Sequence, residues 1–146
     1  MKIFIEEKNE VDEIEVHIIC KQKNKKVISL LKRIKEDKKI IGKSLRGTAQ
    51  ILTLTQVMYF ESVDKRTYSY TESEVYEIDY KLYELESQLS ESKFLRISKS
   101  VILNFSYVTE IKPEEGRRLK VRLQNGEWLM VSRMYVKEIN CILGMK

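Results

Sequence analysis

The chain has few of the residues on which catalysis, metal binding and disulfide scaffolds depend. Its 146 residues include one histidine, two cysteines and one proline. Cys20 and Cys141 lie far apart and neither belongs to a CxxC or Cys/His pattern, so metal and redox motifs are absent. Both cysteines flank apolar residues, which predicts reduced thiols in a core. His17 has no evident partner for acid–base chemistry, so we expect neither an enzyme nor a cofactor or metal site.

Long apolar runs are also absent. No apolar run approaches the roughly 18 residues that a membrane-spanning helix needs, and the N-terminus has no signal-peptide core. These absences predict a cytoplasmic protein. The hydrophobic content of 42% is enough for the core of one domain of ordinary size, with or without a small extension.

Charge is abundant and unevenly distributed along the chain. Lys and Arg exceed Asp and Glu by 27 to 22. The segment Lys21–Arg46 contains eleven bases and two acids, whereas Glu72–Glu91 contains seven acids and one base, Lys81. A basic run of this kind fits a nucleic-acid partner and equally fits a solvated helix face.

The first 39 residues predict a small β-β-α unit. Lys2–Glu6 and Ile14–Cys20 have the composition of strands, and a helix follows because apolar residues recur at i, i+3, i+4 and i+7. These apolar residues are Val27, Leu30, Leu31 and Ile34.

Residues 40–146 predict an α+β domain that is mostly β. Short strands alternate with turn signals, of which Asn125-Gly126 is the strongest. Val57–Phe60 is apolar enough for a central strand, with Glu61–Arg66 as its polar exit, and Val101–Asn104 suggests a helical turn. The other expected strands are Ile40–Leu45, Gln50–Leu54, Arg66–Tyr70, Glu74–Asp79, Tyr107–Lys112, Leu119–Gln124 and Glu127–Val131, and the expected helices are Tyr80–Leu89 and a closing one with Val136, Ile139 and Leu143 on its buried side.

Two segments near the C-terminus combine anion-binding side chains with apolar anchors. In FLRISKSVILN (Phe94–Asn104) the polar residues Arg96, Ser98, Lys99 and Ser100 alternate with residues suited to a core. In VSRMYVKEI (Val131–Ile139) Ser132 is a good helix N-cap, so Arg133 lies where backbone amides also point outward. Both segments are suited to meet a phosphate or a base edge.

These two segments and YFESVDKRTYSY (Tyr59–Tyr70) together resemble a LytTR-type DNA-binding domain, in the order in which that family carries them. The resemblance covers roughly residues 40–144 and implies a LytTR-like β-sheet domain with short helices at 40–146. It also implies sequence-specific binding of double-stranded DNA for transcriptional regulation in bacteria. In the family, loops of the β scaffold enter successive major grooves, and paired direct repeats each take one protomer, which suggests a homodimer on DNA.

The resemblance implies a set of DNA-contacting residues, and the sequence departs from the family within it. Arg133 is the best candidate for a base contact, because arginine can bond bidentately to guanine. At Lys99 other members carry Asn or His, so we expect Lys99 to hold phosphate. Thr67 and Tyr68 replace longer basic or imidazole side chains, and Lys65 or Arg66 can substitute for them. The full set is Lys65, Arg66, Thr67, Tyr68, Arg96, Ser98, Lys99, Ser100 and Arg133.

Two questions stay open at this point. Because Thr67 and Lys99 depart from the family, a second hypothesis stays open: a protein-interaction adaptor or antagonist that retains the scaffold without reading DNA sequence. The resemblance implies that stand-alone members are often held by a membrane-protein inhibitor. The extension Met1–Lys39 can provide that contact, form a dimer interface, or cover an edge of the main sheet.

Overall fold

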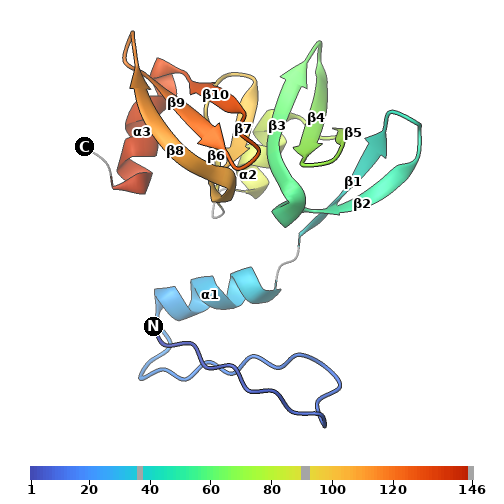
Figure 1. Ribbon diagram of the computed structural model, residues 1–146, viewed down its shortest axis with the longest axis vertical. Helices are drawn as coiled ribbons and strands as arrows, with labels where there is room; N and C mark the ends of the chain where they lie inside the picture. The colour runs from blue at the N-terminus through green and yellow to red at the C-terminus, as the bar shows by residue number, and fades with distance from the viewer. Residues whose placement is uncertain (36–37, 90–92, 145–146) are drawn as a thin grey trace. The chain divides into compact units, whose positions relative to one another are not determined.

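The chain folds into two compact units, Met1–Glu36 (unit 1) and Asp37–Lys146 (unit 2). The structure is a computed structural model that describes residues 1–35, 38–89 and 93–144 (Figure 1). Each unit is described by itself.

Among the described residues of unit 1, the helix α1 (Lys25–Lys35) is the one regular element. Asn24 precedes it, and its side-chain Oδ1 accepts a hydrogen bond from the Val27 N–H at 3.2 Å, which caps the helix start. The helix predicted from the apolar spacing is therefore confirmed. The two strands predicted at Lys2–Glu6 and Ile14–Cys20 are wrong: both segments are described and neither carries a strand assignment, because neither has a paired ladder.

Unit 2 is built on two antiparallel sheets (Figure 1). The larger has the strand order β2-β1-β5-β4-β3-β7-β6 and the smaller β10-β9-β8. In chain order the elements are β1 (Lys39–Ser44), β2 (Ala49–Thr53), η1 (Leu54–Gln56), β3 (Val57–Val63), β4 (Arg66–Thr71), β5 (Val75–Ile78), α2 (Leu82–Gln88), β6 (Phe94–Arg96), β7 (Val101–Asn104), η2 (Phe105–Tyr107), β8 (Val108–Glu114), β9 (Arg118–Leu123), β10 (Trp128–Val131) and α3 (Arg133–Leu143). The α+β, mostly β architecture expected from the sequence is confirmed.

Glycine turns close two of the predicted hairpins. Gly47, between β1 and β2, has φ +85°, and Gly126, between β9 and β10, has φ +89°. Each occupies a left-handed position that costs glycine little because it has no Cβ. The hairpin between β4 and β5 was also expected, and Thr71 closes it by donating from its hydroxyl to the Glu74 carbonyl at 2.8 Å.

The larger sheet has a hydrophobic core on each of its faces. One face carries the cluster that includes α2, with Phe60 and Leu85 fully buried. The other face packs on the small sheet and on Ile139 of α3. A β-bulge in β3 near Met58 places Met58 and Tyr59 in the second cluster, although they are consecutive. This bulge lets one strand serve both cores.

The described residues correct two further predictions. Val101–Asn104 is a strand and not a helical turn; Asn104 is structural, as expected, because its amide donates to the Val57 carbonyl at 3.0 Å and its oxygen accepts from the Ser106 N–H. Cys20 and Cys141 are free and exposed rather than in the core.

Along the closing helix α3 the predicted buried stripe is only partly realised. Ile139 is 1% exposed and Val136 is half-buried, but Leu143 is 39% exposed. The helix ends at Gly144, whose φ of +70° is the usual left-handed C-terminal stop. Loss of burial in the last turn fits its position at that stop.

Candidate nucleic-acid interface

The loop between β6 and β7 is a tight, internally bonded turn. The Ile97 N–H donates to the Val101 carbonyl at 3.0 Å, and the Ser100 N–H donates to the Ser98 hydroxyl at 3.2 Å. The two serine hydroxyls lie 3.4 Å apart. Lys99, between them, is exposed. The turn therefore presents Lys99 to solvent and uses Ser98 to hold its own backbone.

Arg96 supports this turn from inside. Its Nε donates to the Ser98 carbonyl at 2.8 Å, and its Nη2 donates to the Lys99 carbonyl. Its Nη1 pairs with the Glu86 carboxylate of α2 at 2.9 Å. The Arg96 side chain is only 17% exposed. The guanidinium that the sequence suggested as a DNA contact is thus used to hold two carbonyls of the loop.

Backbone hydrogen bonds tie the same turn to its neighbours on both sides. The Ser62 N–H, near the end of β3, donates to the Ser100 carbonyl at 2.8 Å. The Ser132 N–H, just before α3, donates to the Ile97 carbonyl at 2.8 Å. The end of β3, the loop and the start of α3 therefore lie side by side. The fold brings together three segments that are far apart in the sequence.

Arg133 is the first residue of α3 and its side chain is exposed. Ser132 occupies the N-cap position predicted for it, with φ −63° and ψ 145°, but its hydroxyl makes no capping hydrogen bond. Amides of the first helical turn lack partners within a helix, and the helix dipole adds partial positive charge there. Arg133 thus extends from a site that already attracts anions.

The segment after β3 is a two-residue hairpin turn and not the longer polar exit expected at Glu61–Arg66. β3 continues to Val63 and pairs with Arg66 at the start of β4. Asp64 and Lys65 have φ +50° and +66°, the pattern of a type I′ turn, whose twist suits a hairpin. Lys65 is exposed at the tip of this hairpin.

Along β4 the predicted contact residues alternate between solvent and core. Arg66 is exposed and lies 3.9 Å from the Glu77 carboxylate. Tyr68, two residues on, is half-buried on the same side of the strand. Thr67 between them is 6% exposed and points into the core. In this structure Thr67 is therefore a packing residue, because strand alternation turns it away from solvent.

A stacked pair of tyrosines, one buried and one half-buried, braces the interface from behind. The rings of Tyr59 and Tyr70 stack at 4.4 Å, and their hydroxyls donate to Glu127 at 2.8 Å and to Glu61 at 3.0 Å. Burial, followed by the hydrogen bond to Glu61, raises the pKa of Tyr70 to about 12. Burial, followed by the bond to Glu127, raises the pKa of Tyr59 even further. This brace joins the β3–β4 hairpin to the turn before β10, which leads to α3.

Sequence reasoning missed the supporting residues of the site. These residues act through contacts between distant segments, which local sequence patterns do not predict. They are Glu86, Tyr59, Tyr70 and Glu127. Only the hydrogen bond between Tyr70 and Glu61 could have been expected from the sequence, since the two residues lie nine residues apart on strands that pair with each other.

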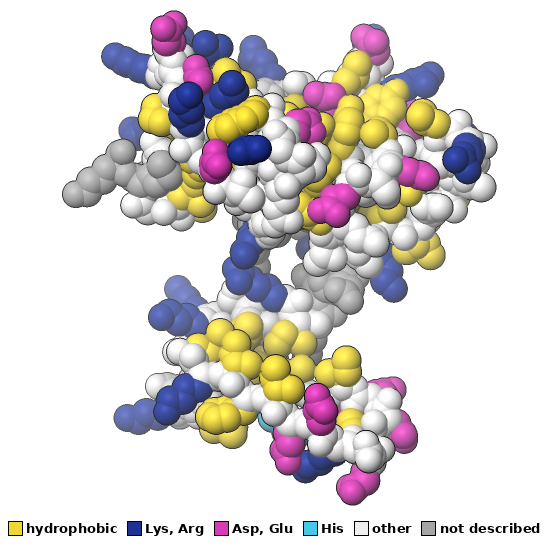
Figure 2. Space-filling model, in the orientation of Figure 1, with side chains coloured by type: hydrophobic (Ala, Val, Ile, Leu, Met, Phe, Trp, Pro, Cys, Tyr) yellow, Lys and Arg dark blue, Asp and Glu magenta, His cyan; other side chains and the backbone are white. Residues whose placement is uncertain are grey.

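The outer face of the small sheet carries a separate cluster of cations. The Lys120 ammonium lies 5.3 Å, and the Arg122 guanidinium 5.8 Å, from the centre of the Trp128 ring. Trp128 is half-buried beneath these side chains. The tryptophan is therefore used in cation–π contacts within the protein. Figure 2 shows acidic and basic side chains interspersed over this part of unit 2.

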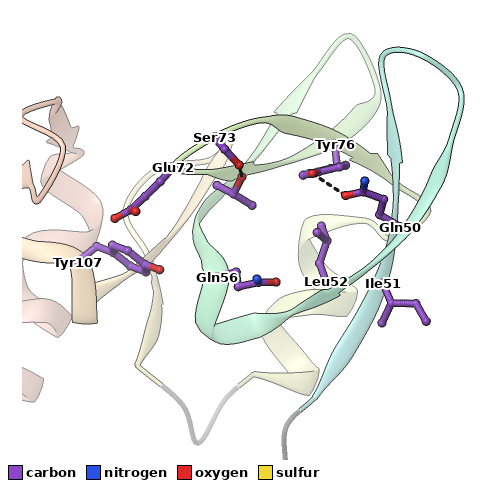
Figure 3. Close-up of a pocket in the computed structure, with 9 residues that line it drawn as sticks. Gln50, Ile51, Leu52, Gln56, Glu72, Ser73, Tyr76 and Tyr107 are labelled. Atoms are coloured by element: carbon purple, nitrogen blue, oxygen red, sulfur yellow. Dashed lines mark hydrogen bonds between the residues drawn. The ribbon is translucent and has the colours of Figure 1, made fainter.

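An open hollow of about 340 Å³ lies at the other end of β4 from the hairpin tip. Figure 3 shows polar side chains around it, including Tyr76, which donates to Gln50 at 2.7 Å. Tyr107 also lines it and donates to the Thr55 carbonyl at 2.7 Å. Both tyrosine hydroxyls are thus already hydrogen-bonded within the protein, and none of the lining residues belongs to the predicted contact set.

Within the part of the chain that the structure describes, no helix combines the length and the apolar composition that crossing a membrane requires.

Comparison with known proteins identifies the same region. Residues 48–144 match the family model described as the LytTr DNA-binding domain. A Staphylococcus aureus (strain MSSA476) protein, named an uncharacterized HTH-type transcriptional regulator, is 28% identical over 142 residues, which are 95% of this chain and 94% of that relative. The sensory transduction protein LytT of Enterococcus faecalis is 35% identical over 95 residues, 64% of this chain and 39% of the relative.

A solved structure supports the same relationship. The LytTr DNA-binding domain of a Bacillus cereus protein, named as a methyl-accepting/DNA response regulator, superposes with a TM-score of 0.70 and 28% sequence identity. The match covers 75% of this chain and 100% of that domain.

Proposed function

Because this chain belongs to the LytTr DNA-binding domain family, it binds DNA, and we propose that it regulates transcription by reading a specific double-stranded site with loops. The proteins of this family are regulators and not enzymes. We place its site of action in the bacterial cytoplasm, where the DNA is.

The observation that carries the proposal is the pair of backbone hydrogen bonds that joins three segments. Ser62 bonds to the β6–β7 loop from one side and Ser132 from the other. Three exposed cations, Lys65, Lys99 and Arg133, therefore project from neighbouring segments on a braced scaffold. Contacts held rigidly in this way lose little conformational freedom on binding.

We assign roles to the exposed residues by their chemistry. Arg133 reads a guanine edge from the start of α3, because its planar fork matches the O6 and N7 acceptors. Lys99 and Lys65 hold phosphate as point charges. Arg66 adds a further charge at the hairpin. Tyr68, half-buried beside Arg66, contributes packing against the backbone of the DNA.

The remaining predicted contacts take supporting roles. Ser98 and Ser100 shape the turn that carries Lys99. Arg96 positions that turn, and Thr67 packs the strand. The proposed contact set is thus smaller than the one the sequence suggested.

The family resemblance also supports a finer proposal for the arrangement on DNA. One protomer places the β3–β4 hairpin and the start of α3 in successive major grooves, with the β6–β7 loop between them. Two protomers occupy a direct repeat. A membrane-protein inhibitor stays a prediction, which copurification from membranes with the intact chain would test.

Selection from a random double-stranded DNA library tests the proposal. The wild type should enrich a repeated motif. Arg133→Ala should relax one position of it, at a cost of roughly 1–3 kcal/mol in discrimination. Arg133→Lys keeps the charge and loses the fork, so it should relax the same position while leaving the salt dependence of binding unchanged.

Lys99→Ala tests the phosphate role in the same assay. It should weaken binding to all sequences evenly and lower the salt slope by about one. Lys43→Ala is the matched control, since Lys43 is exposed on β1, three strands from β3 in the sheet. Weak, uniform binding with no motif would refute sequence reading and favour the protein-interaction adaptor.

A further inference from the structure

Unit 1 exposes an apolar surface that it cannot bury by itself. No described residue of this unit is buried, and only Ile18 and three residues of α1 are half-buried. Segments of fewer than about 40 residues seldom form a sufficient core alone. The large apolar side chains exposed in this unit are Met1, Ile3, Phe4, Ile5, Val11, Ile14, Val16, Ile19, Ile28 and Ile34.

The area of this surface matches what a dimer needs. Ten such side chains offer roughly 600–1,200 Å² per copy, if each contributes about 60–120 Å² on full burial. A standard protein interface buries about 800 Å² on each partner. Scattered single exposed residues need no partner, but ten within one small unit do.

Unit 1 contains one acidic and one basic segment. Residues Glu6–Glu15 contain six acids and one base, Lys8, and residues Lys21–Lys35 contain seven bases and no acid. In Figure 2 the acidic and basic side chains of this unit gather toward different ends, with apolar side chains between them. Such a surface is complementary to itself when one copy is turned by half a revolution against another.

The backbone offers a further means of pairing. Lys2–Glu6 and Ile14–Cys20 have strand-like compositions, and neither described segment carries a strand ladder. Extended segments of this kind add readily to a strand from another chain.

We propose that unit 1 is a dimerisation module whose partner is a second copy of this chain. The apolar side chains of the two copies pack together. The acidic segment Glu6–Glu15 of each copy lies against the basic segment Lys21–Lys35 of the other. The inference concerns unit 1 alone and goes beyond the proposed DNA-binding function, so it stands or falls without DNA.

Sedimentation equilibrium of the full chain, without DNA, tests this inference. The wild type should sediment as a dimer at micromolar concentration. Ile14→Ser and Ile19→Ser should each raise the dimer dissociation constant by about tenfold or more. These side chains are 96% and 97% exposed in the single chain, so the substitutions leave the fold of the monomer unchanged.

Charge reversal distinguishes a second copy from any other occupant. Lys25→Glu/Lys26→Glu and Glu10→Lys/Glu13→Lys should each raise the dimer dissociation constant, because each places like charges opposite one another at the reversed positions and weakens the attraction between the two segments. Acidic residues in the first turn of a helix are favourable, so α1 should persist in the first variant, as circular dichroism would verify. Mixed together, the two variants should form a heterodimer, since both contacts are restored.

Three outcomes would overturn the inference. One is a wild type that stays monomeric over the whole concentration range. Another is a dimer whose dissociation constant no unit 1 variant changes. The control Lys112→Glu, in unit 2, is expected to leave that constant unchanged. The third is a mixture of reversed variants that fails to associate. A monomer that binds lipid vesicles or a different protein through these residues would point to that occupant instead.

Discussion

Replacing Arg96 with lysine distinguishes two possible roles of this residue, a contact with a DNA phosphate and support of the β6–β7 loop. If Arg96 held a phosphate of the DNA, lysine would keep the charge and most of the affinity. In the structure its guanidinium donates to the Ser98 and Lys99 carbonyls and pairs with Glu86. A lysine ammonium cannot reproduce this planar fork. We therefore expect Arg96→Lys to weaken DNA binding nearly as much as Arg96→Ala does.

The size of the effect follows from the bonds that are lost. A hydrogen bond to a charged group contributes about 1.5–3 kcal/mol, and Arg96 makes two to the loop carbonyls. The Glu86 carboxylate is 53% exposed, so that ion pair adds less than about 1 kcal/mol. If restoring the order of the loop on binding costs the equivalent of one of these two bonds, affinity should fall by about 10- to 100-fold, at 1.4 kcal/mol for each factor of ten.

DNA affinity measured over a range of salt concentrations, with amide hydrogen exchange of the free protein, checks this prediction. In the free Arg96→Lys protein the Ser62 and Ser100 amides should exchange faster, because both bonds depend on the loop. Arg66→Lys, at an exposed arginine of the hairpin, is the matched control and should bind nearly as the wild type does. If Arg96→Lys retains wild-type affinity while Arg96→Ala lowers the salt slope by about 0.9, Arg96 is a phosphate contact and the reasoning fails.

Two further predictions concern stability. A Cβ added at Gly42 would lie 2.8 Å from Leu52 Cδ1 and equally close to the Tyr76 Cβ. Gly42→Ala should therefore lower the free energy of unfolding by about 1–3 kcal/mol in denaturant titrations. An unchanged midpoint would show that β2 and β5, which carry Leu52 and Tyr76, shift away from β1 freely. Folding raises the pKa of Tyr70 to about 12 from its usual 10. The stability that the protonated Tyr70 contributes is therefore fully present below pH 10 and is lost as the pH rises toward 12. Tyr70→Phe should flatten this alkaline decline in thermal melts, and an equally steep decline would contradict the assigned burial.

Local patterns predicted much of the fold because they act over a few residues. Gly47 and Asn125-Gly126 favour turns wherever the chain places them, and both lie in hairpins. The apolar spacing of α1 predicted its helix by the same logic. The three motifs around Tyr59–Tyr70, Phe94–Asn104 and Val131–Ile139 identified the family before the tertiary structure was considered, and residues 48–144 belong to it.

Predictions failed where the result depended on a partner from elsewhere in the chain. Lys2–Glu6 has the composition of a strand, but a strand also needs a neighbour to bond to, and the described residues of unit 1 supply none. The turn Asp64-Lys65 lacks glycine, so its two left-handed residues gave no signal for a tight hairpin. The cross-strand pairing of Val63 with Arg66 decides it.

The sequence by itself determined the family, the mostly β architecture and the regions that supply the interface. Those properties are encoded in periodicity, turn residues and motif order, which are local. Only the tertiary structure decided which polar side chains of those regions are available to DNA. Thr67 turns into the core and Arg96 is held by Glu86, whereas Lys99 and Arg133 project into solvent. The physical reason is that the availability of a charged or polar group depends on the distant segments packed against it.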